Sequence, residues 1–240
     1  MLLRRLSEQS AACKAQARGA LTGKYGVAVG ANLFVWGASF LLPQVILLLS
    51  PGNGLLFLLS SLALTFCAAL LLGVLRAGLY FLYLNILFDR PATFGDLFYV
   101  FRENADKAIR VQAALSGLEI ACLLPSMAAQ FLLPGAAPAI VAARVLLYLA
   151  GSAVWIFFQL RFSLSFFLLL DFPQLSALAV LRQSARLMRG RKGRLLYMAL
   201  SFLPLCLLGL LSCGVGFLWL AAYFYETLAA FYKNAVTAVK

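Results

Sequence analysis

The most constraining feature of the chain is a basic segment followed at once by a long uncharged one. Residues 182–194, RQSARLMRGRKGR, contain six Lys or Arg side chains, and residues 195–225 contain no Asp, Glu, Lys or Arg. A bilayer interior accepts neither a free charge nor an unpaired backbone amide, so this transition is typical of a helix that enters a membrane from its cationic side. The same transition occurs after Lys24 and after Arg110.

The composition fits a membrane protein with several spans. Of the 240 residues, 64% are hydrophobic and only 12% are charged, whereas soluble domains are nearer half apolar and a quarter charged. The Lys and Arg residues that give the net charge of +12 lie mostly outside the apolar segments and not on a separate domain. This distribution therefore indicates the positive-inside bias of a membrane protein and not a nucleic-acid-binding surface.

The residues needed for common catalytic and metal sites are missing. The chain has no His, and its five Cys residues form no C-x-x-C pair. It also has no Walker phosphate-binding motif and no span with paired carboxylates. We expect no catalytic residue, no cofactor and no metal site, and the cysteines are interpreted as small buried apolar groups.

The hydrophobic pattern predicts an all-α protein with six transmembrane helices. Three short turns, at 50–54, 134–138 and 213–216, would join the helices as three antiparallel hairpins. The expected spans are 26–49, 55–86, 111–133, 139–170, 195–212 and 217–232.

Each hairpin is preceded by a segment with the pattern of an amphipathic helix. Residues 1–22 place a basic face opposite an apolar one, which fits either a helix in the membrane interface or one packed on the protein's own cytoplasmic face. Thr93 and Asp96 have the spacing of a capping box at the start of a second helix, whose apolar face is Phe94, Leu97, Phe98 and Phe101. In the third, Leu178, Leu181, Ala185 and Met188 are expected on one face and Arg182, Arg186 and Arg189 on another.

The positions of the cations predict the orientation in the membrane. Seventeen of the 20 Lys and Arg residues fall in the N-terminal segment, the two loops after the first two hairpins, and the C-terminal tail, and the three turns contain none. The positive-inside rule then predicts a multi-pass membrane protein with both termini in the cytoplasm.

A repeat is visible in the same segments. Lys24, Lys107 and Lys192 lie 83 and 85 residues apart, and an Asp-x-Pro sequence follows the first two hairpins. The interpretation is one membrane domain, 1–240, in which units 24–104 and 105–190 repeat a helix and a hairpin, and 191–240 is a truncated third unit.

The C-terminal half carries ordered motifs that resemble a known family. They are Asp171-Phe-Pro173, Ser184-Ala-Arg-Leu-Met188, Arg189-Gly-Arg-Lys192, Leu200-Ser-Phe202, Gly214-Val-Gly-Phe-Leu-Trp219 and Phe231-Tyr232. Together they resemble the bacterial integral-membrane family known as domain of unknown function 975, although Ala222 stands where that family has proline. The resemblance implies six spans and no known catalytic residue.

One acid is expected deep in the membrane. Glu119 lies roughly 13–15 Å into its span, where a carboxylate must be protonated, be paired or face water. Arg144 is the arginine nearest to it in depth. The pair is therefore a candidate intramembrane polar site, either as a structural tie between helices or as a proton or cation site.

The basic segment is the other candidate site. Arg182, Arg186, Arg189, Arg191, Lys192 and Arg194 are expected to contact anionic lipid headgroups or a partner, which could be another protein or a second copy of the chain. Gly190 and Gly193 fit either a phosphate-binding turn or a simple linker. The function predicted from this is a non-enzymatic membrane scaffold or interaction protein with a basic cytoplasmic face. The alternative is a small transporter or channel that uses Glu119.

Overall fold

The computed structural model describes residues 2–49, 55–103, 105–132, 135, 137–212 and 214–237, and the regular structure within these ranges is helical. The elements are α1 (Leu2–Leu21), α2 (Tyr25–Leu49), α3 (Leu55–Leu87), η1 (Phe94–Phe98), α4 (Tyr99–Glu103), α5 (Ala105–Leu132), α6 (Pro138–Phe162), α7 (Ser165–Asp171), α8 (Ala177–Leu187), α9 (Lys192–Leu200), α10 (Leu203–Leu211) and α11 (Gly216–Thr237). The turn predicted at 50–54 lies outside the described residues, as do parts of the turns at 134–138 and 213–216.

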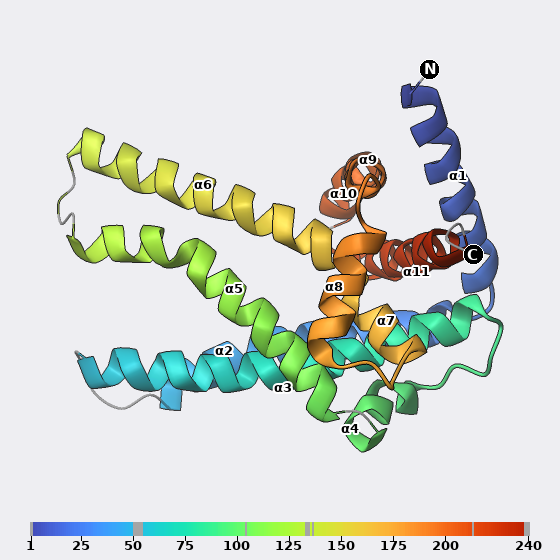
Figure 1. The fold of residues 1–240 in the computed structure, drawn as a ribbon, viewed down its shortest axis with the longest axis horizontal. Coiled ribbons are helices and arrows are strands. Elements are labelled where there is room, and N and C mark those ends of the chain that lie inside the picture. Colours follow the sequence, from blue (N-terminus) through green and yellow to red (C-terminus); the bar gives the residue numbers. More distant parts are fainter. Residues whose placement is uncertain are drawn as a thin grey trace.

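Two long helical pairs extend from the body of the molecule, as Figure 1 shows on its left side. α2 packs with α3, and α5 packs with α6. α6 has no buried residue, and its large apolar side chains are open, with Leu146 66% and Tyr148 56% exposed. So much exposed apolar surface is stable in contact with lipid and not with water.

Five helical segments are long and apolar enough to cross a membrane: Tyr25–Ile46, Ala63–Leu87, Ala105–Ala129, Pro138–Asp171 and Lys192–Leu211. They correspond to the first five predicted spans and confirm the all-α class, with five helices whose length and composition fit a membrane. The predicted sixth span, 217–232, lies in α11 and is not among these five. Glu226 and several tyrosines lower the hydropathy of that helix.

The third helical pair differs from the first two. The fifth predicted span is split into α9 and α10, because the helix is interrupted at Ser201–Phe202 just before Pro204, which sits in the first turn of α10. Proline cannot supply the backbone donor that a continuous helix needs there. In Figure 1, α9 and α10 are seen nearly end-on, so they do not run parallel to the two long pairs.

The N-terminal helix packs on the protein itself. Its apolar face, with Ala17 and Leu21 fully buried, lies against α11. Lys14 donates from Nζ to the carbonyl oxygen of Ser201 at 3.1 Å, at the break between α9 and α10, and its ammonium lies over the Phe202 ring. Burial lowers the pKa of Lys14, and the positive charge of Arg18 lowers it further. Of the two arrangements open for 1–22, the structure has the helix docked on the chain.

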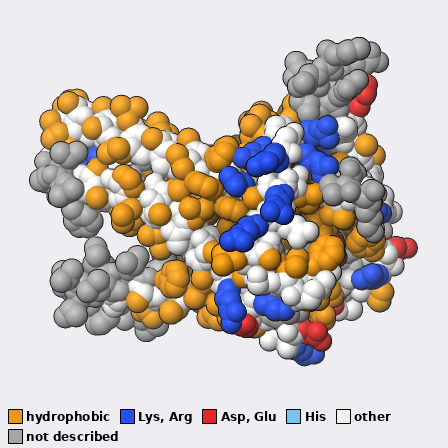
Figure 2. Space-filling model, viewed as in Figure 1, with side chains coloured by type: hydrophobic (Ala, Val, Ile, Leu, Met, Phe, Trp, Pro, Cys, Tyr) orange, Lys and Arg blue, Asp and Glu red, His pale blue; other side chains and the backbone are white. Residues whose placement is uncertain are grey.

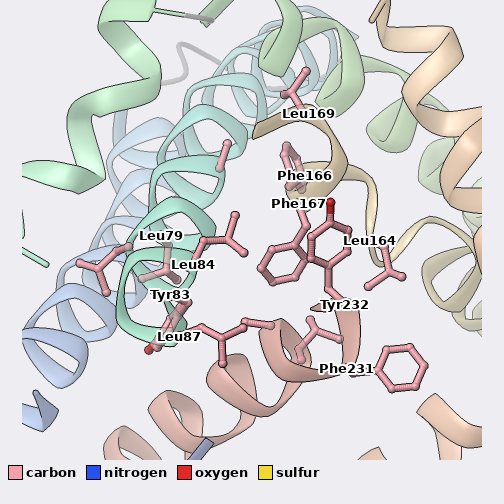
Figure 3. Packing of buried hydrophobic residues seen from close by; sticks show 14 of the residues in the cluster. Leu79, Tyr83, Leu84, Leu87, Leu164, Phe166, Phe167, Leu169, Phe231 and Tyr232 are labelled. Atoms are coloured by element: carbon pink, nitrogen blue, oxygen red, sulfur yellow. The ribbon is translucent and has the colours of Figure 1, made fainter. Parts of the chain in front are cut away.

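The hydrophobic core lies where α3, α7 and α11 meet (Figure 3). Phe167 of α7 is fully buried and stacks on Tyr232 of α11 with ring centroids 5.1 Å apart. Its edge meets Tyr80 of α3 at 4.7 Å. This contact depends on the interruption of the fourth span at 163–164, which turns α7 away from α6 and into the core.

Two glycines allow helices to approach closely. A side chain at Gly151 of α6 would place its Cβ 2.6 Å from the Cys122 carbonyl oxygen of α5. A Cβ at Gly78 of α3 would lie 1.9 Å from the carbonyl oxygen of Leu97 in η1. Small residues at such contacts are common between membrane helices, where close backbone packing supplies much of the attraction.

Lys24 and Lys107 make corresponding contacts. Lys24 Nζ lies 2.6 Å from Oδ1 of Asp89, in the Asp-x-Pro sequence that follows the first hairpin. Lys107 Nζ donates to the carbonyl oxygen of Pro173, in the Asp-x-Pro sequence that follows the second. In both cases, the lysine at the start of a long helical pair contacts the Asp-x-Pro segment that follows the same pair.

The predicted start of the second amphipathic helix is confirmed. The Thr93 backbone N–H donates to Oδ2 of Asp96 at 3.0 Å, and the helix begins as the short η1 before it continues as α4. Leu97 is fully buried, whereas Phe94, Phe98 and Phe101 are about two-fifths exposed, at 43%, 39% and 41%. These three rings form an open aromatic surface beside α2.

Candidate functional site

The basic side chains of α8 are set by how that helix packs. Ser176 caps its N-terminus, with the Ser176 hydroxyl accepting from the Ala179 backbone N–H at 3.3 Å. The buried positions of the helix and its C-cap are Val180, Leu181, Ser184 and Met188. Arg182, Arg186 and Arg189 therefore point outward, as predicted.

Of the four residues predicted to form the apolar face of α8, two are buried and two are not. Leu181 and Met188 are buried, but Leu178 is 65% exposed and Ala185 is half-buried. The buried face is rotated toward Val180 and Ser184 because the Ser184 hydroxyl donates to the Arg161 carbonyl oxygen of α6 at 3.2 Å. A small polar residue can thus lie on the inner face of a helix when a free carbonyl faces it.

A glycine turn reverses the chain between α8 and α9. Gly190 has φ +76°, a left-handed conformation that non-glycine residues rarely adopt. This turn brings Lys192, at the start of α9, back beside α8. Lys192 Nζ lies 3.7 Å above the ring of Phe157 in α6.

The result is a cavity of about 520 Å³ lined by cations from three helices and the glycine turn. We call it the basic groove. Its lining contains five cationic side chains and no acid: Arg161, Arg182, Arg186, Arg189 and Lys192. Gly190 and Gly193 also line it. Figure 2 shows Lys and Arg side chains gathered on this face, over α8 and α9, beside the apolar surface of the long pairs.

Arg161 is the member of the basic groove that the sequence analysis did not assign to it. It comes from the last turn of α6, and its Nε is buried without a hydrogen-bond partner among the described residues. The sequence does not reveal this role, because Arg161 is far from residues 182–194 along the chain. Only the packing of α6 against α8 brings Arg161 close to those residues.

The other two predicted cations, Arg191 and Arg194, lie apart from the groove. They line a second cavity of about 280 Å³ between α1, α9 and α11. Arg191 Nη1 donates to the Ala235 carbonyl oxygen at 2.6 Å, so this arginine holds the end of α11. The predicted set of six therefore separates into four groove residues and two that face α1 and α11.

The structure places Glu119 half-buried in α5. Its carboxylate interacts electrostatically with Arg76 of α3, an exposed side chain. Arg144 of α6 is also half-buried. Glu119 lines neither the basic groove, nor the cavity at α1 and α11, nor a third cavity between α10 and α11.

The most buried acid that the structure describes is not Glu119 but Glu226. Glu226 of α11 is 0% exposed, and neither carboxylate oxygen has a hydrogen-bond partner among the described residues. The sequence pattern predicts Glu119 as the acid far from both membrane surfaces, and Glu226 was not predicted as a buried acid. The available signal was an acid in the middle of the apolar stretch 217–232.

The comparisons with known proteins give one match. Residues 123–239 match the model of a family described as "Protein of unknown function (DUF975)", which confirms the resemblance drawn from the motifs. Neither the curated proteins nor the solved structures contain a match to the chain. The matched segment includes α6 to α11 and with them the basic groove and Glu226.

Proposed function

We propose that this chain, whose C-terminal half matches a membrane-protein family of unknown function, is a non-enzymatic interaction protein that binds the phosphate of anionic lipids in its basic groove. The observation that carries the proposal is the concentration of five cations, with no acid, around one cavity. Arg side chains have a planar set of donors that matches a phosphate, and a lysine adds a point charge.

The position of the basic groove supports a lipid as the ligand. Arg161 lies in the last turn of α6, where the long helical pair ends, and Lys192 begins the apolar segment Lys192–Leu211. A headgroup at the groove would thus sit at the level where apolar helices begin, with its acyl chains beside the exposed side chains of α6 and α10. Cations near an anionic membrane surface contribute about 1 kcal/mol each.

The proposed topology places the groove in the cytoplasm, with three hairpins entering the bacterial cytoplasmic membrane from that side. α11 would return the chain so that both termini are cytoplasmic. The support is the cation distribution in the sequence.

Cysteine labelling tests this orientation. Single cysteines at Ala137 and at Gln183, in a background without the native cysteines, place a thiol at two exposed positions. A membrane-impermeant reagent added to intact cells should label position 137 and not position 183. Labelling of position 183 from outside would reject the topology.

Lipid binding is tested with the full chain in neutral detergent. Thermal unfolding is followed while a short-chain anionic phospholipid or a zwitterionic one is added. The wild type should bind the anionic lipid more tightly, and Arg182→Ala with Arg186→Ala should weaken that binding by about 30-fold, from roughly 2 kcal/mol in total. Added salt should weaken it as well.

A matched control removes the same charge elsewhere. Arg90 and Arg110 are exposed and lie outside the basic groove, and Arg110 pairs with Asp106 at 3.0 Å. Arg90→Ala with Arg110→Ala should leave the affinity within about twofold, since exposed charges at a distance are screened. Equal losses in the two double variants would show general charge attraction and would contradict a site in the groove.

A further inference from the structure

The middle of α11 buries an acid in the packed interior. Glu226 and Thr227 are both 0% exposed, and so are the neighbouring Ala229 and Ala230. α11 packs there against α1, α2 and α3. An isolated carboxylate in such an environment is strongly destabilising unless it is protonated, paired or bound to a cation.

The groups around this acid leave it without a direct hydrogen bond among the described residues. Tyr83 of α3 interacts with it electrostatically, as does Lys24 in the turn just before α2. Tyr83 is fully buried, and its hydroxyl accepts a hydrogen bond from Asn32 Nδ2. The Asn32 Oδ1 atom is likewise buried with no hydrogen-bond partner among the described residues.

The elements packed against α11 carry other ionisable groups. Among the described side chains these are Glu8, Cys13, Lys14 and Arg18 of α1, Tyr25 of α2, Cys67, Arg76 and Tyr80 of α3, and Cys206 of α10, with Tyr223, Tyr225, Tyr232 and Lys233 on α11 itself. Lys14 is held at the Ser201 carbonyl. Lys24 is therefore the cation whose charge acts on Glu226.

Lys24 interacts both with the buried acid and with an acid at the surface. Its Nζ lies 2.6 Å from Oδ1 of Asp89, and the side chains of Lys24 and Asp89 are 27% and 94% exposed. The same ammonium acts electrostatically on Glu226. It is hydrogen-bonded to Asp89, and Glu226 has no hydrogen-bond partner among the described residues.

We infer that Glu226 is a proton-binding site in the core, reached from solvent past Asp89 and Lys24, and that α11 packs on α2 and α3 with this acid neutral. One proton is taken from solvent when the carboxylate becomes a carboxylic acid, and no other group changes its charge. The neutral acid gains an O–H donor in a core that holds the unpaired Asn32 Oδ1 acceptor. This site is separate from the basic groove and does not depend on lipid binding.

The test is infrared spectroscopy of the full chain in detergent. A buried neutral acid gives a carboxylic C=O band distinct from the carboxylate bands. The wild type should keep this band at neutral pH, Glu226→Gln should lose it, and Glu119→Gln should keep it. Glu119 is the matched control because it is also a glutamate within an apolar helix but is only half-buried.

Thermal unfolding supplies a second readout on the same variants. If the folded state holds the proton and the unfolded state releases it, the wild type should lose stability as pH rises from roughly 5 to 8. Glu226→Gln should remove that dependence and be the more stable protein at the higher pH, while Glu119→Gln should follow the wild type.

Lys24→Gln keeps the test informative even if Glu226→Gln fails to fold. Removing the positive charge should shift loss of the wild-type band to higher pH, because the carboxylate loses its stabilising cation. A wild type without the band at neutral pH, or a Lys24→Gln variant with an unchanged titration, would overturn the inference. Specific stabilisation by Na⁺ or K⁺ at constant ionic strength, without the band, would show a bound metal cation instead and would also overturn it.

Discussion

Removing the ring of Phe167 should separate the contribution of the central core from that of the lipid-facing helices. Phe167 is fully buried, stacks on Tyr232 at 5.1 Å and meets Tyr80 edge-on at 4.7 Å. Phe→Ala substitutions in protein cores lower the free energy of unfolding by about 3–5 kcal/mol, because the transfer free energy of the ring is lost and a cavity is left behind. The two ring contacts favour the upper part of that range.

We expect Phe167→Ala to lower the free energy of unfolding by about 4 kcal/mol. For chains of 150–250 residues this corresponds to a fall in melting temperature of roughly 10 °C. The assay is thermal unfolding in detergent, with size-exclusion chromatography to show that the variant is folded at the start. Because α7 joins the fourth span to α3 and α11, the loss should also loosen α11.

Phe40→Ala is the control. Phe40 lies on α2 and is 69% exposed, so truncation removes a ring that faces lipid or detergent in the folded state as well. Its effect should be below about 1 kcal/mol. Equal losses in the two variants, or a loss below about 1 kcal/mol for Phe167→Ala, would refute a core centred on α7.

Two further substitutions test contacts outside this core. The Lys24 ammonium donates to Asp89 and holds the pKa of that carboxyl below its usual range, so the pair stabilises the fold above the unfolded pKa and is lost as pH falls through the folded one. The wild type should therefore lose more melting temperature than Asp89→Asn between roughly pH 5 and pH 2, and parallel acid profiles would contradict the pair. Gly151→Ala places a Cβ 2.6 Å from the Cys122 carbonyl oxygen and should destabilise α5 against α6 by about 1–3 kcal/mol, whereas a Cβ at Gly117 of α5 meets nothing within 4 Å. Gly117→Ala should be neutral or mildly stabilising in the same thermal assay, and similar losses in both would argue against the close contact.

Local features of the chain were predictable because they depend on local free energies. Apolar runs of sufficient length give helices that prefer lipid wherever the rest of the chain lies. The outward position of Arg182, Arg186 and Arg189 followed from their spacing, and the capping contact of Thr93 with Asp96 from four consecutive residues.

Helix breaks were harder to predict. The hydrophobic pattern predicts one continuous helix over 195–212, although Pro204 lies within it and the structure breaks the helix just before this proline. The break at 163–164 has no proline or glycine near it. The break allows Phe167 to be buried against Tyr80 and Tyr232, and this burial stabilises the interrupted helix.

The helical class, the first five apolar segments and the cationic character of 182–194 follow from the amino-acid sequence alone. Each of these depends on the transfer of a continuous stretch between water and lipid, which composition sets. Tertiary structure decided that Arg161 joins the basic groove while Arg191 instead holds the end of α11. It also decided that Glu226 is enclosed and Glu119 is not. Those outcomes depend on which helices pack together, because burial of a side chain is a property of its neighbours in space and not of its neighbours in the chain.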